Sequence, residues 1–163
     1  MHIRDAAECD IPVITEIYND AVLTTTAIWN DQKVSEDNRR GWLDNHRDGG
    51  FPVIVAVDEN DAVLGYATYG PWRNFDGYRF SVEHSVYVLR NARGGGIGRQ
   101  LMEALIDRAR AQDLHVMVAG IDASNQVSIE LHKKLGFVET GILTEVGTKF
   151  GRWLDLTFLQ LTL

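Results

Sequence analysis

Four of the five residues from Gly94 to Gly98 are glycine, and an arginine stands on each side of them, at Arg93 and Arg99. An apolar run precedes this stretch, and an amphipathic helical pattern follows it. A glycine-rich loop that leads from a strand into a helix exposes unpaired backbone N–H groups at the positive end of the helix dipole. Such groups bind anions, and glycine lets a phosphate approach the backbone closely. The stretch therefore predicts a phosphate-binding loop.

Three phosphate-binding patterns can be compared with this loop. The P-loop needs a lysine followed by serine or threonine, and no such pair follows here. The dinucleotide fingerprint needs three spaced glycines, and counted from Gly96 its third position is Leu101. The pattern R-x-x-G-x-G fits without a gap and comprises Arg93, Gly94, Gly95, Gly96, Ile97 and Gly98. The alternative is a glycine-rich turn that binds nothing.

The elements around this loop indicate an α/β fold on a mixed sheet. Alternating or continuous apolar runs predict strands at residues 2–4, 51–58, 62–70, 78–89 and 115–121, and two more within residues 137–163. Helical spacing of apolar residues predicts helices after a cap at Asp10, at residues 35–47 and 97–109, and at residues 124–135 before Gly136. No linker or repeat interrupts this order, so residues 1–163 are expected to form one domain.

Composition and charge limit the functional classes. The chain has 163 residues, of which 45% are apolar and 24% charged, as in globular domains. It has no apolar run long enough to span a membrane and no apolar leader, so no membrane contact is expected. The single cysteine, Cys9, fits a reducing cytoplasm. A formal net charge of −7 without a basic stripe argues against nucleic-acid binding.

Two motifs together resemble the GCN5-related N-acetyltransferase (GNAT) family. One is R-x-x-G-x-G at residues 93–98, and the other is N-Q-V-S-I-E-L-H-K-K-L-G-F at residues 125–137. The resemblance spans nearly the whole chain. It implies a single GNAT-type α/β domain, with a mixed, mostly antiparallel sheet that is splayed in the middle and flanked by helices. It implies no metal.

The same resemblance implies acetyl-coenzyme A (acetyl-CoA) as the cosubstrate, bound between two parallel strands. The amides of residues 94–99 would take the pyrophosphate, the backbone of residues 86–88 would pair with the pantetheine arm, and Asn125 would contact that arm. The cofactor-binding residues implied in this way are Val86, Tyr87, Val88, Arg93, Gly94, Gly95, Gly96, Ile97, Gly98, Arg99 and Asn125.

A narrower resemblance rests on V-E-H-S-V-Y-V at residues 82–88. This strand is similar to one in phosphinothricin and methionine sulfoximine acetyltransferases, and residues 17–30 and 151–161 look similar to that subfamily as well. Its members acetylate the α-amine of small amino-acid analogues with a tetrahedral phosphorus or sulfur group, and many are dimers. The resemblance thus implies a small-molecule amine as substrate and a homodimer as the assembly.

The reaction needs a base, because an α-amine is mostly protonated at neutral pH. By resemblance Glu83 is this base, directly or through a water, and such help is worth roughly 10²–10⁴-fold in rate. The alternative is that Glu83 is an exposed or ion-paired strand residue. If Glu83 is the base, burial should raise the pKa of its carboxyl above the usual value of about 4.3.

Two histidines are further candidates. His132 stands where many family members carry a tyrosine that protonates the coenzyme A thiolate, so it is either that acid or a helix histidine that orders the site. His84 either lines the substrate site or packs. Strand alternation places Glu83 and Ser85 on one face, and His84 and Val86 on the other. A backbone N–H near Val86 is the candidate donor to the oxyanion.

A turn-rich loop at residues 70–80 is expected to help bind the substrate. Arg73 can hold a carboxylate through two parallel hydrogen bonds; the alternative is a hairpin loop with ordinary surface side chains. The predicted substrate-binding set is Arg73, Asn74, Phe75, Glu83, His84 and Ser85. Secondary candidates are Trp29 and Asn30, which would line the same cleft, and Lys149, Arg152 and Trp153, which would approach the site of a partner subunit.

Two rival functions stay open at this level. One is acetylation of another amine, such as a polyamine, an aminoglycoside or a protein N-terminus. Arg73 and Arg79 beside the expected cleft argue against a polycation. The other is a coenzyme A-binding module without catalysis, against which Glu83 and His132 argue. An assay of thiol release with a panel of amines separates these possibilities.

Overall fold

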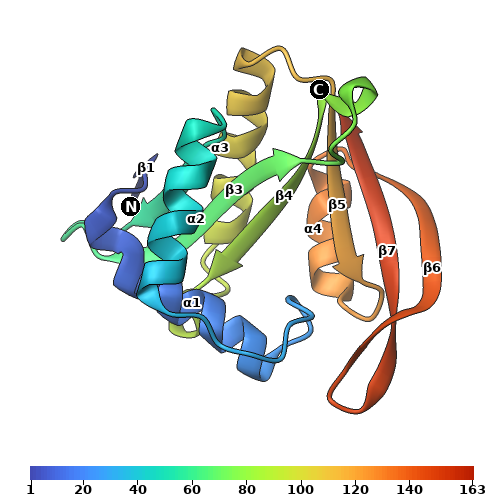
Figure 1. The fold of residues 1–163 in the computed structure, drawn as a ribbon, viewed down its shortest axis with the longest axis horizontal. Coiled ribbons are helices and arrows are strands. Elements are labelled where there is room, and N and C mark those ends of the chain that lie inside the picture. The colour runs from blue at the N-terminus through green and yellow to red at the C-terminus, as the bar shows by residue number, and fades with distance from the viewer.

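Seven strands form one sheet in the computed structural model, which describes all of residues 1–163 (Figure 1). Their order across the sheet is β1-β2-β3-β4-β5-β7-β6. The strands are β1 (His2–Asp5), β2 (Val53–Val57), β3 (Val63–Pro71), β4 (Ser81–Val88), β5 (Val116–Asp122), β6 (Val138–Lys149) and β7 (Arg152–Thr162). The helices are α1 (Ile11–Thr24), α2 (Glu36–Asp48), α3 (Ile97–Ala111) and α4 (Gln126–Lys134). The predicted α/β architecture is confirmed.

The sheet opens between its two central strands. β4 and β5 are parallel, whereas all other neighbouring strands are antiparallel. The pairing of β4 with β5 ends at Glu83, opposite Val118. β4 then continues to Val88 and β5 to Asp122, and Figure 1 shows the two strands diverging. This confirms the expected splay in a mostly antiparallel sheet.

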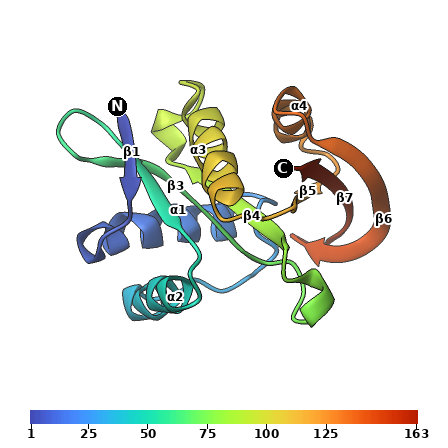
Figure 2. The same cartoon turned by 90° about the horizontal axis from the view of Figure 1, so that it is seen from above.

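Helices cover both faces of the sheet. α1 and α2 lie on one face, and α3 and α4 lie on the other (Figure 2). α3 packs firmly because its apolar residues recur every three or four positions and are buried, namely Ile97, Leu101, Leu105 and Ala109. The core cluster under α3 and α4 has 18 buried residues, against 10 under α1 and α2. None of the helices combines the length and the apolar character needed to cross a bilayer.

Two predicted boundaries move by a few residues for local reasons. β4 begins at Ser81 rather than at residue 78, because Asp76–Tyr78 form a 3-10 turn. α4 begins at Gln126 rather than at residue 124, because Asn125 is its cap: the Asn125 side chain accepts the backbone N–H of Ser128. Both changes leave the order of elements as the sequence predicts it.

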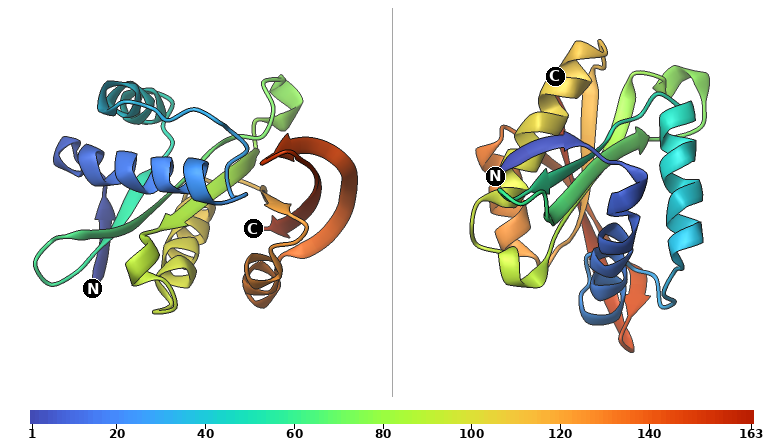
Figure 3. Two further views of the ribbon diagram at one scale, coloured as in Figure 1. Left: turned by 90° about the horizontal axis from the view of Figure 1, so that it is seen from below. Right: turned by 90° about the vertical axis from the view of Figure 1, so that its left-hand side faces the viewer.

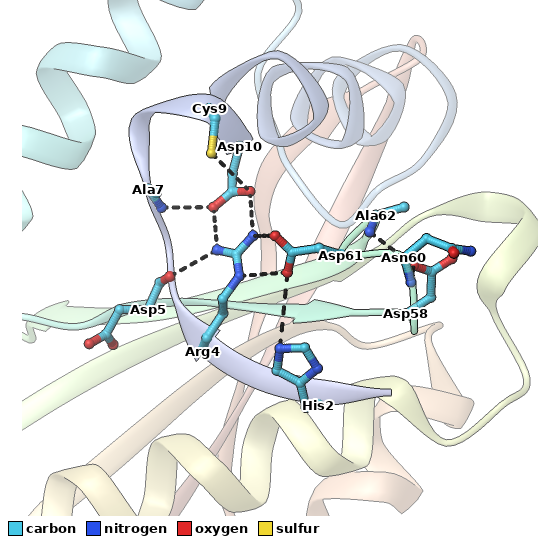
Figure 4. A network of polar contacts seen from close by, with 10 residues as sticks. All are labelled: His2, Arg4, Asp5, Ala7, Cys9, Asp10, Asp58, Asn60, Asp61 and Ala62. Atoms are coloured by element: carbon cyan, nitrogen blue, oxygen red, sulfur yellow. Dashed lines mark hydrogen bonds and ion pairs between the residues drawn. The ribbon is translucent and has the colours of Figure 1, made fainter.

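Arg4 joins three segments at the N-terminal edge of the sheet (Figure 4). Its guanidinium donates to the carboxylate of Asp10 at 2.7 and 3.0 Å and to that of Asp61 at 2.9 and 3.1 Å. Asp10 occupies the predicted cap position of α1, but its carboxylate accepts the N–H of Ala7 instead of capping that helix. The hydrogen bond from Arg4 lowers the pKa of the Asp61 carboxyl. The network ties β1 and the start of α1 to the β2–β3 turn.

Candidate active site

The edge of β4 that faces the splay carries unpaired N–H groups. Leu89, directly after β4, donates its N–H to the carbonyl oxygen of Leu64 on β3 at 2.9 Å. Because hydrogen-bonding direction alternates along a strand, the N–H groups of Val88 and Val86 point to the opposite edge. β5 has already separated from β4 at this point. The edge is therefore open to an extended ligand, which can add to it as another strand would.

Three adjoining cavities follow this open edge. The inner cavity, of about 260 Å³, is lined by Thr26, Ala27, Trp29, Glu83, His84, Ser85, Val86, Tyr87, Gly120, Ile121, Asp122, Asn125, Ser128, His132 and Leu156. The middle cavity, of about 500 Å³, shares Val86 and Asn125 with the inner one. The outer cavity, of about 670 Å³, shares Val88 and Arg93 with the middle one. The three cavities thus lead from Glu83 to the glycine-rich loop.

The glycine-rich loop forms a wall of the outer cavity. Gly94 and Gly96 have left-handed backbone, with φ of 86° and 76°, which residues with side chains rarely adopt. Gly96 is the cap residue of α3, and no side chain occupies the N–H groups that follow it. The predicted residues that line this cavity are Arg93, Gly94, Gly96, Ile97, Gly98 and Arg99, whereas Gly95 does not. Lys134 adds a third positive side chain, which suits an anion.

Arg93 fixes the loop to its surroundings. Its Nε donates to the carbonyl oxygen of Val88 at 3.2 Å, and its guanidinium lies 3.7 Å from the carboxylate of Asp20 on α1. Arg90 binds the same carboxylate at 2.7 Å. The loop is therefore held to the end of β4 and to α1, so that its backbone amides keep one direction.

Asn125 lies where the inner and middle cavities meet. Its Oδ1 accepts the N–H of Ser128 at 3.2 Å and so caps α4. Its side-chain amide still has two N–H donors, because the cap uses only the oxygen. The geometry agrees with the predicted contact between Asn125 and an extended ligand along β4.

Glu83 stands where β4 and β5 part, and it lines the inner cavity. Gly120 of β5 leaves room for it, since a Cβ at that position would lie 3.1 Å from Glu83 Oε1. Burial raises the pKa of the Glu83 carboxyl, as predicted for a base. A carboxylate with a raised pKa takes a proton from an amine more readily than an exposed one.

His84 and His132 form a buried hydrogen-bonded pair. Their Nε2 atoms lie 2.9 Å apart, much closer than their ring centroids at 4.9 Å, so the rings meet edge to edge. His132 Nδ1 lies 2.7 Å from the carbonyl oxygen of Ser128 and must donate to it, because a carbonyl only accepts. A neutral His132 then accepts at Nε2 from His84, whose Nδ1 is buried without a partner.

Burial keeps this pair neutral. It lowers the pKa of His84 to about 3, with a smaller contribution from His132, and it also lowers the pKa of His132. A further proton would create a buried N–H at His84 Nδ1 without an acceptor. In this arrangement His132 has no N–H free for a thiolate. The structure contains no group of three or more His, Cys, Asp or Glu side chains that could hold a metal ion.

The predicted substrate loop lies outside the three cavities. Residues 73–75 are exposed and line none of the three cavities. The guanidinium of Arg73 lies 5.3 Å from the ring centre of Trp72, which packs edge-on against Phe158 at 5.4 Å. Phe158 borders Gly120, where a Cβ would lie 3.6 Å from its ring. A row of aromatic side chains therefore connects Arg73 with the inner cavity.

The secondary candidates separate into two groups. Trp29 lines the inner cavity, whereas Asn30 is exposed and lines none of the three cavities. Lys149 is 3% exposed and donates to backbone carbonyls of its own chain, which corrects the expectation that it reaches a partner's site. Arg152 and Trp153 are exposed at the start of β7.

Several cavity residues lie outside the motifs that the sequence analysis used. Asp122 at the end of β5 accepts the hydroxyl hydrogen of Thr26, and it accepts the N–H and hydroxyl of Ser124, both at 2.9 Å. A polar residue at the carboxyl end of a buried parallel strand is a general signal for a site, and it could have indicated Asp122. Nothing local in the sequence marks Gly120 or Leu156.

A splayed α/β sheet with a glycine-rich loop at the head of a helix, an open strand edge and a half-buried carboxyl at its end defines an acyltransferase that uses an acyl-coenzyme A. Comparison with known families agrees with this class. The chain belongs to the acetyltransferase (GNAT) family, whose model matches residues 14–137 and thus more than half of the chain. The family resemblance stated from the two motifs is confirmed.

Three similar proteins support this membership. An L-methionine sulfoximine/L-methionine sulfone acetyltransferase of Pseudomonas aeruginosa is 58% identical over 161 residues, covering 99% of this chain and 94% of that protein. The structure of an acetyltransferase of Salmonella typhimurium with its cofactor acetyl-CoA is similar with a TM-score of 0.97. The two sequences are 55% identical, and the match covers 99% of this chain and 93% of that chain. A ribosomal-protein-alanine N-acetyltransferase from Brucella melitensis is 55% identical with a TM-score of 0.98, covering 100% of both chains. This chain is an acetyl-CoA-dependent N-acetyltransferase.

Proposed function

We propose that the protein transfers the acetyl group of acetyl-CoA to the α-amine of a small amino-acid analogue of the methionine sulfoximine, methionine sulfone or phosphinothricin type. The observation that carries the proposal is the small inner cavity, in which the half-buried carboxyl of Glu83 stands at the end of the open edge of β4. The substrate in the name of the Pseudomonas aeruginosa relative supports the same class.

Acetyl-CoA is proposed to lie along the three cavities. Its pyrophosphate would accept hydrogen bonds from the backbone amides of residues 94–99, at the start of α3. Its pantetheine arm would pair with the N–H groups of Val86 and Val88 and meet the side-chain amide of Asn125. Because the thioester is at the far end of that arm, this order brings it into the inner cavity beside Glu83.

The amine enters as an ammonium and must lose a proton before it attacks. Glu83 takes this proton, directly or through a water. The nitrogen then attacks the thioester carbon, a C–N bond forms, and the carbonyl oxygen becomes an oxyanion that a backbone N–H near Val86 stabilises. The C–S bond breaks next. The nitrogen loses its second surplus proton, and the departing thiolate gains one, so that the products are an amide and a thiol.

His132 is proposed to position the site rather than to donate the proton that the thiolate gains. Both of its ring nitrogens already bind within the protein, to Ser128 and to His84. The pair links α4 to β4, and α4 begins at Asn125, which is proposed to meet the pantetheine arm. The thiolate would then take its proton from the substrate nitrogen, which must lose one in the same step.

The rest of the substrate is proposed to contact the loop at residues 73–75 and the polar wall of the inner cavity. Arg73, with Asn74 and Phe75 in the same loop, would close over the carboxylate, and a guanidinium can hold it with two parallel hydrogen bonds. Ser85, in the inner cavity, carries a hydroxyl that can donate to an oxygen of a tetrahedral head. A polyamine has no carboxylate for Arg73 and would repel it.

A thiol-release assay with acetyl-CoA and a panel of amines tests the proposal. The panel contains methionine sulfone, methionine sulfoximine, phosphinothricin, spermidine, an aminoglycoside and a peptide that begins with alanine. We expect the amino-acid analogues to have the highest kcat/KM, with the product acetylated at the α-amine by mass spectrometry. Preference for spermidine, the aminoglycoside or the peptide would contradict the substrate, and release with none of them would contradict catalysis on this class of amine.

We also propose that the chain forms a homodimer. β6, the β6–β7 turn and the start of β7 expose several large apolar side chains, namely Val138, Ile142, Leu143, Val146, Phe150 and Trp153. Exposed apolar patches of this kind are typical of association surfaces. Light scattering of the purified protein should give twice the chain mass, and Trp153→Asp combined with Ile142→Asp should shift it to the monomer. A wild-type monomer at micromolar concentration would contradict this.

A further inference from the structure

The connection between α1 and α2, residues 25–35, forms one wall of the inner cavity. Thr26 and Ala27 line both the inner and the middle cavity, whereas Trp29 lines only the inner one, where Glu83 lies. Figure 3 shows this connection beyond the end of α1, on the side of the molecule where β6 and β7 lie. The wall nearest to the proposed amine site therefore comes from a segment outside the glycine-rich loop and α4.

Two charged side chains hold this wall in place. The ammonium of Lys149 on β6 donates to the backbone carbonyl oxygens of Thr25 and Ile28, at 2.7 and 2.5 Å. The carboxylate of Asp122 on β5 accepts a hydrogen bond from the hydroxyl of Thr26. Lys149 is 3% exposed and Asp122 is 6% exposed, so water competes little for these bonds. The wall is tied to two strands of the sheet.

The ring of Trp29 packs against the backbone of β6 at Gly147, where only glycine leaves room for it. A Cβ at Gly147 of β6 would lie 2.2 Å from two ring carbons of Trp29, so any other residue there must displace the ring. The indole N–H donates to the carbonyl oxygen of Thr26 at 2.8 Å. Contacts with β6 and with its own loop therefore fix the position of the ring.

The same ring borders the most confined part of the site. The inner cavity measures about 260 Å³ and is the smallest of the three. Its other walls include the backbone of β4 and Gly120 of β5, which cannot move without breaking the sheet. Among the large apolar side chains around it, Trp29 is the one that the α1–α2 connection supplies.

We propose that Trp29 is a specificity-determining residue, whose ring, seated against Gly147, limits the size of the side group that the amine substrate can carry. The proposal rests on the proposed function, because it takes the inner cavity as the amine site. Lys149 and Asp122 are positioning residues in this scheme, since they hold the segment that carries the ring.

Removal of the ring should widen the range of amines. One or two methylene groups in an apolar pocket change discrimination by about 10–200-fold. In Trp29→Ala we therefore expect the ratio of kcat/KM for phenylalanine to that for methionine sulfone to rise by at least about tenfold. The KM for acetyl-CoA should change by less than about twofold, because Trp29 borders neither the middle nor the outer cavity. Trp29→Phe should shift the ratio in the same direction.

Displacement of the ring should weaken binding of the preferred amine. In Gly147→Ala the ring must move, and we expect the KM for methionine sulfone to rise by about tenfold or more. Gly141→Ala is the matched control on the same strand, because nothing lies within 4 Å of a Cβ there. It should behave as the wild type.

The double variant decides between a specific and a general effect. If Gly147→Ala acts through the ring, it should have no further effect on the KM for the amine in a Trp29→Ala background. An equal effect in both backgrounds, or an unchanged substrate ratio in Trp29→Ala and Trp29→Phe, would overturn the proposal. Melting temperatures separate a loss of folding from a change of specificity. If the wild type prefers another amine, the proposed function fails, and the same cycle with that amine and a bulkier analogue tests Trp29 separately.

Discussion

The outer and inner cavities lie along one strand but are built from different parts of the chain. The outer cavity uses backbone amides of a short segment, residues 94–99, whose direction two left-handed glycines set. The inner cavity uses side chains from the α1–α2 connection, β4, β5, α4 and β7. A site of backbone amides suits a ligand part that is constant, such as a pyrophosphate. A site of dispersed side chains suits a part that differs between enzymes, such as the amine.

This difference predicts that substitutions in the outer cavity and substitutions in the inner cavity have separate effects. A variant of the glycine-rich loop should weaken acetyl-CoA binding without changing which amine is preferred. A variant of the inner cavity should change the rate or the amine preference without changing the affinity for acetyl-CoA. A variant that changes both the affinity for acetyl-CoA and the amine preference would count against this separation.

The largest expected effect is that of Glu83→Gln. The carboxamide cannot take a proton from the ammonium, so kcat should fall by roughly 10²–10⁴-fold. The wild-type kcat/KM should rise with pH as Glu83 deprotonates, with a midpoint above the usual carboxyl pKa because burial raises it. The rise of kcat/KM with pH should be absent in the variant. The affinity for acetyl-CoA by calorimetry should stay within about twofold. Full turnover of Glu83→Gln at neutral pH would show that Glu83 is not the base.

Gly96→Ala should have the next largest effect, and it should change only the binding of acetyl-CoA in the outer cavity. A side chain at a φ of 76° is strained, which costs about 1–2 kcal/mol and turns the amides at the start of α3. We expect the dissociation constant for acetyl-CoA to rise by about tenfold or more. Gly50→Ala is the matched control, because Gly50 has nearly the same φ, 75°, with nothing within 4 Å of a Cβ, and lies outside the loop. Equal affinities in both variants would remove the phosphate site from this loop.

A smaller effect is expected from Arg73→Ala, and it should change only the binding of the amine substrate. Loss of the guanidinium should raise the KM for the amino-acid analogue by roughly tenfold, as expected for a lost charged hydrogen bond, and leave the KM for acetyl-CoA alone. Arg79→Ala serves as the control, since Arg79 donates to the carbonyl oxygen of Asp76 within the same loop. If both variants retain the wild-type KM, the loop does not bind the carboxylate.

The histidine pair should affect stability more than rate. The pKa of His84 falls from 6.5 to about 3 in the folded protein. Between these values the unfolded chain binds a proton that the folded chain does not, so stability should decrease as the pH is lowered through this window. Replacement of both His84 and His132 by leucine should flatten this dependence in urea unfolding. An unchanged slope would show that the pair is not neutral in the fold.

Prediction from the sequence succeeded where a structural feature is formed by residues adjacent in the chain. The glycine-rich loop could be found because strand, glycines and helix are adjacent in the chain. The splay and the choice of Glu83 as the base both followed from the family resemblance. The rise in its pKa could be predicted as well, since burial of a carboxyl has one direction of effect.

The remaining features depend on contacts between distant segments. The ring of Trp29 packs against Gly147 on β6, and no local sequence pattern links Gly147 to residues 25–35. Lys149 looked like a surface residue near a partner, because a lysine is rarely buried. It is buried since two backbone carbonyls of the α1–α2 connection satisfy its ammonium. The sequence left His132 as either an acid or a helix histidine that orders the site, and its two hydrogen bonds favour the second role.

The most direct test of the proposed function compares kcat/KM for methionine sulfone, methionine and spermidine with saturating acetyl-CoA. Methionine and its sulfone share the carboxylate, the α-amine and the chain length, and differ in the two oxygens of the tetrahedral head. A site that hydrogen-bonds those oxygens rejects a substrate without them strongly. The proposal predicts that the sulfone exceeds methionine by at least about tenfold and that spermidine is the poorest. Equal values for methionine and its sulfone, or the highest value for spermidine, would contradict it.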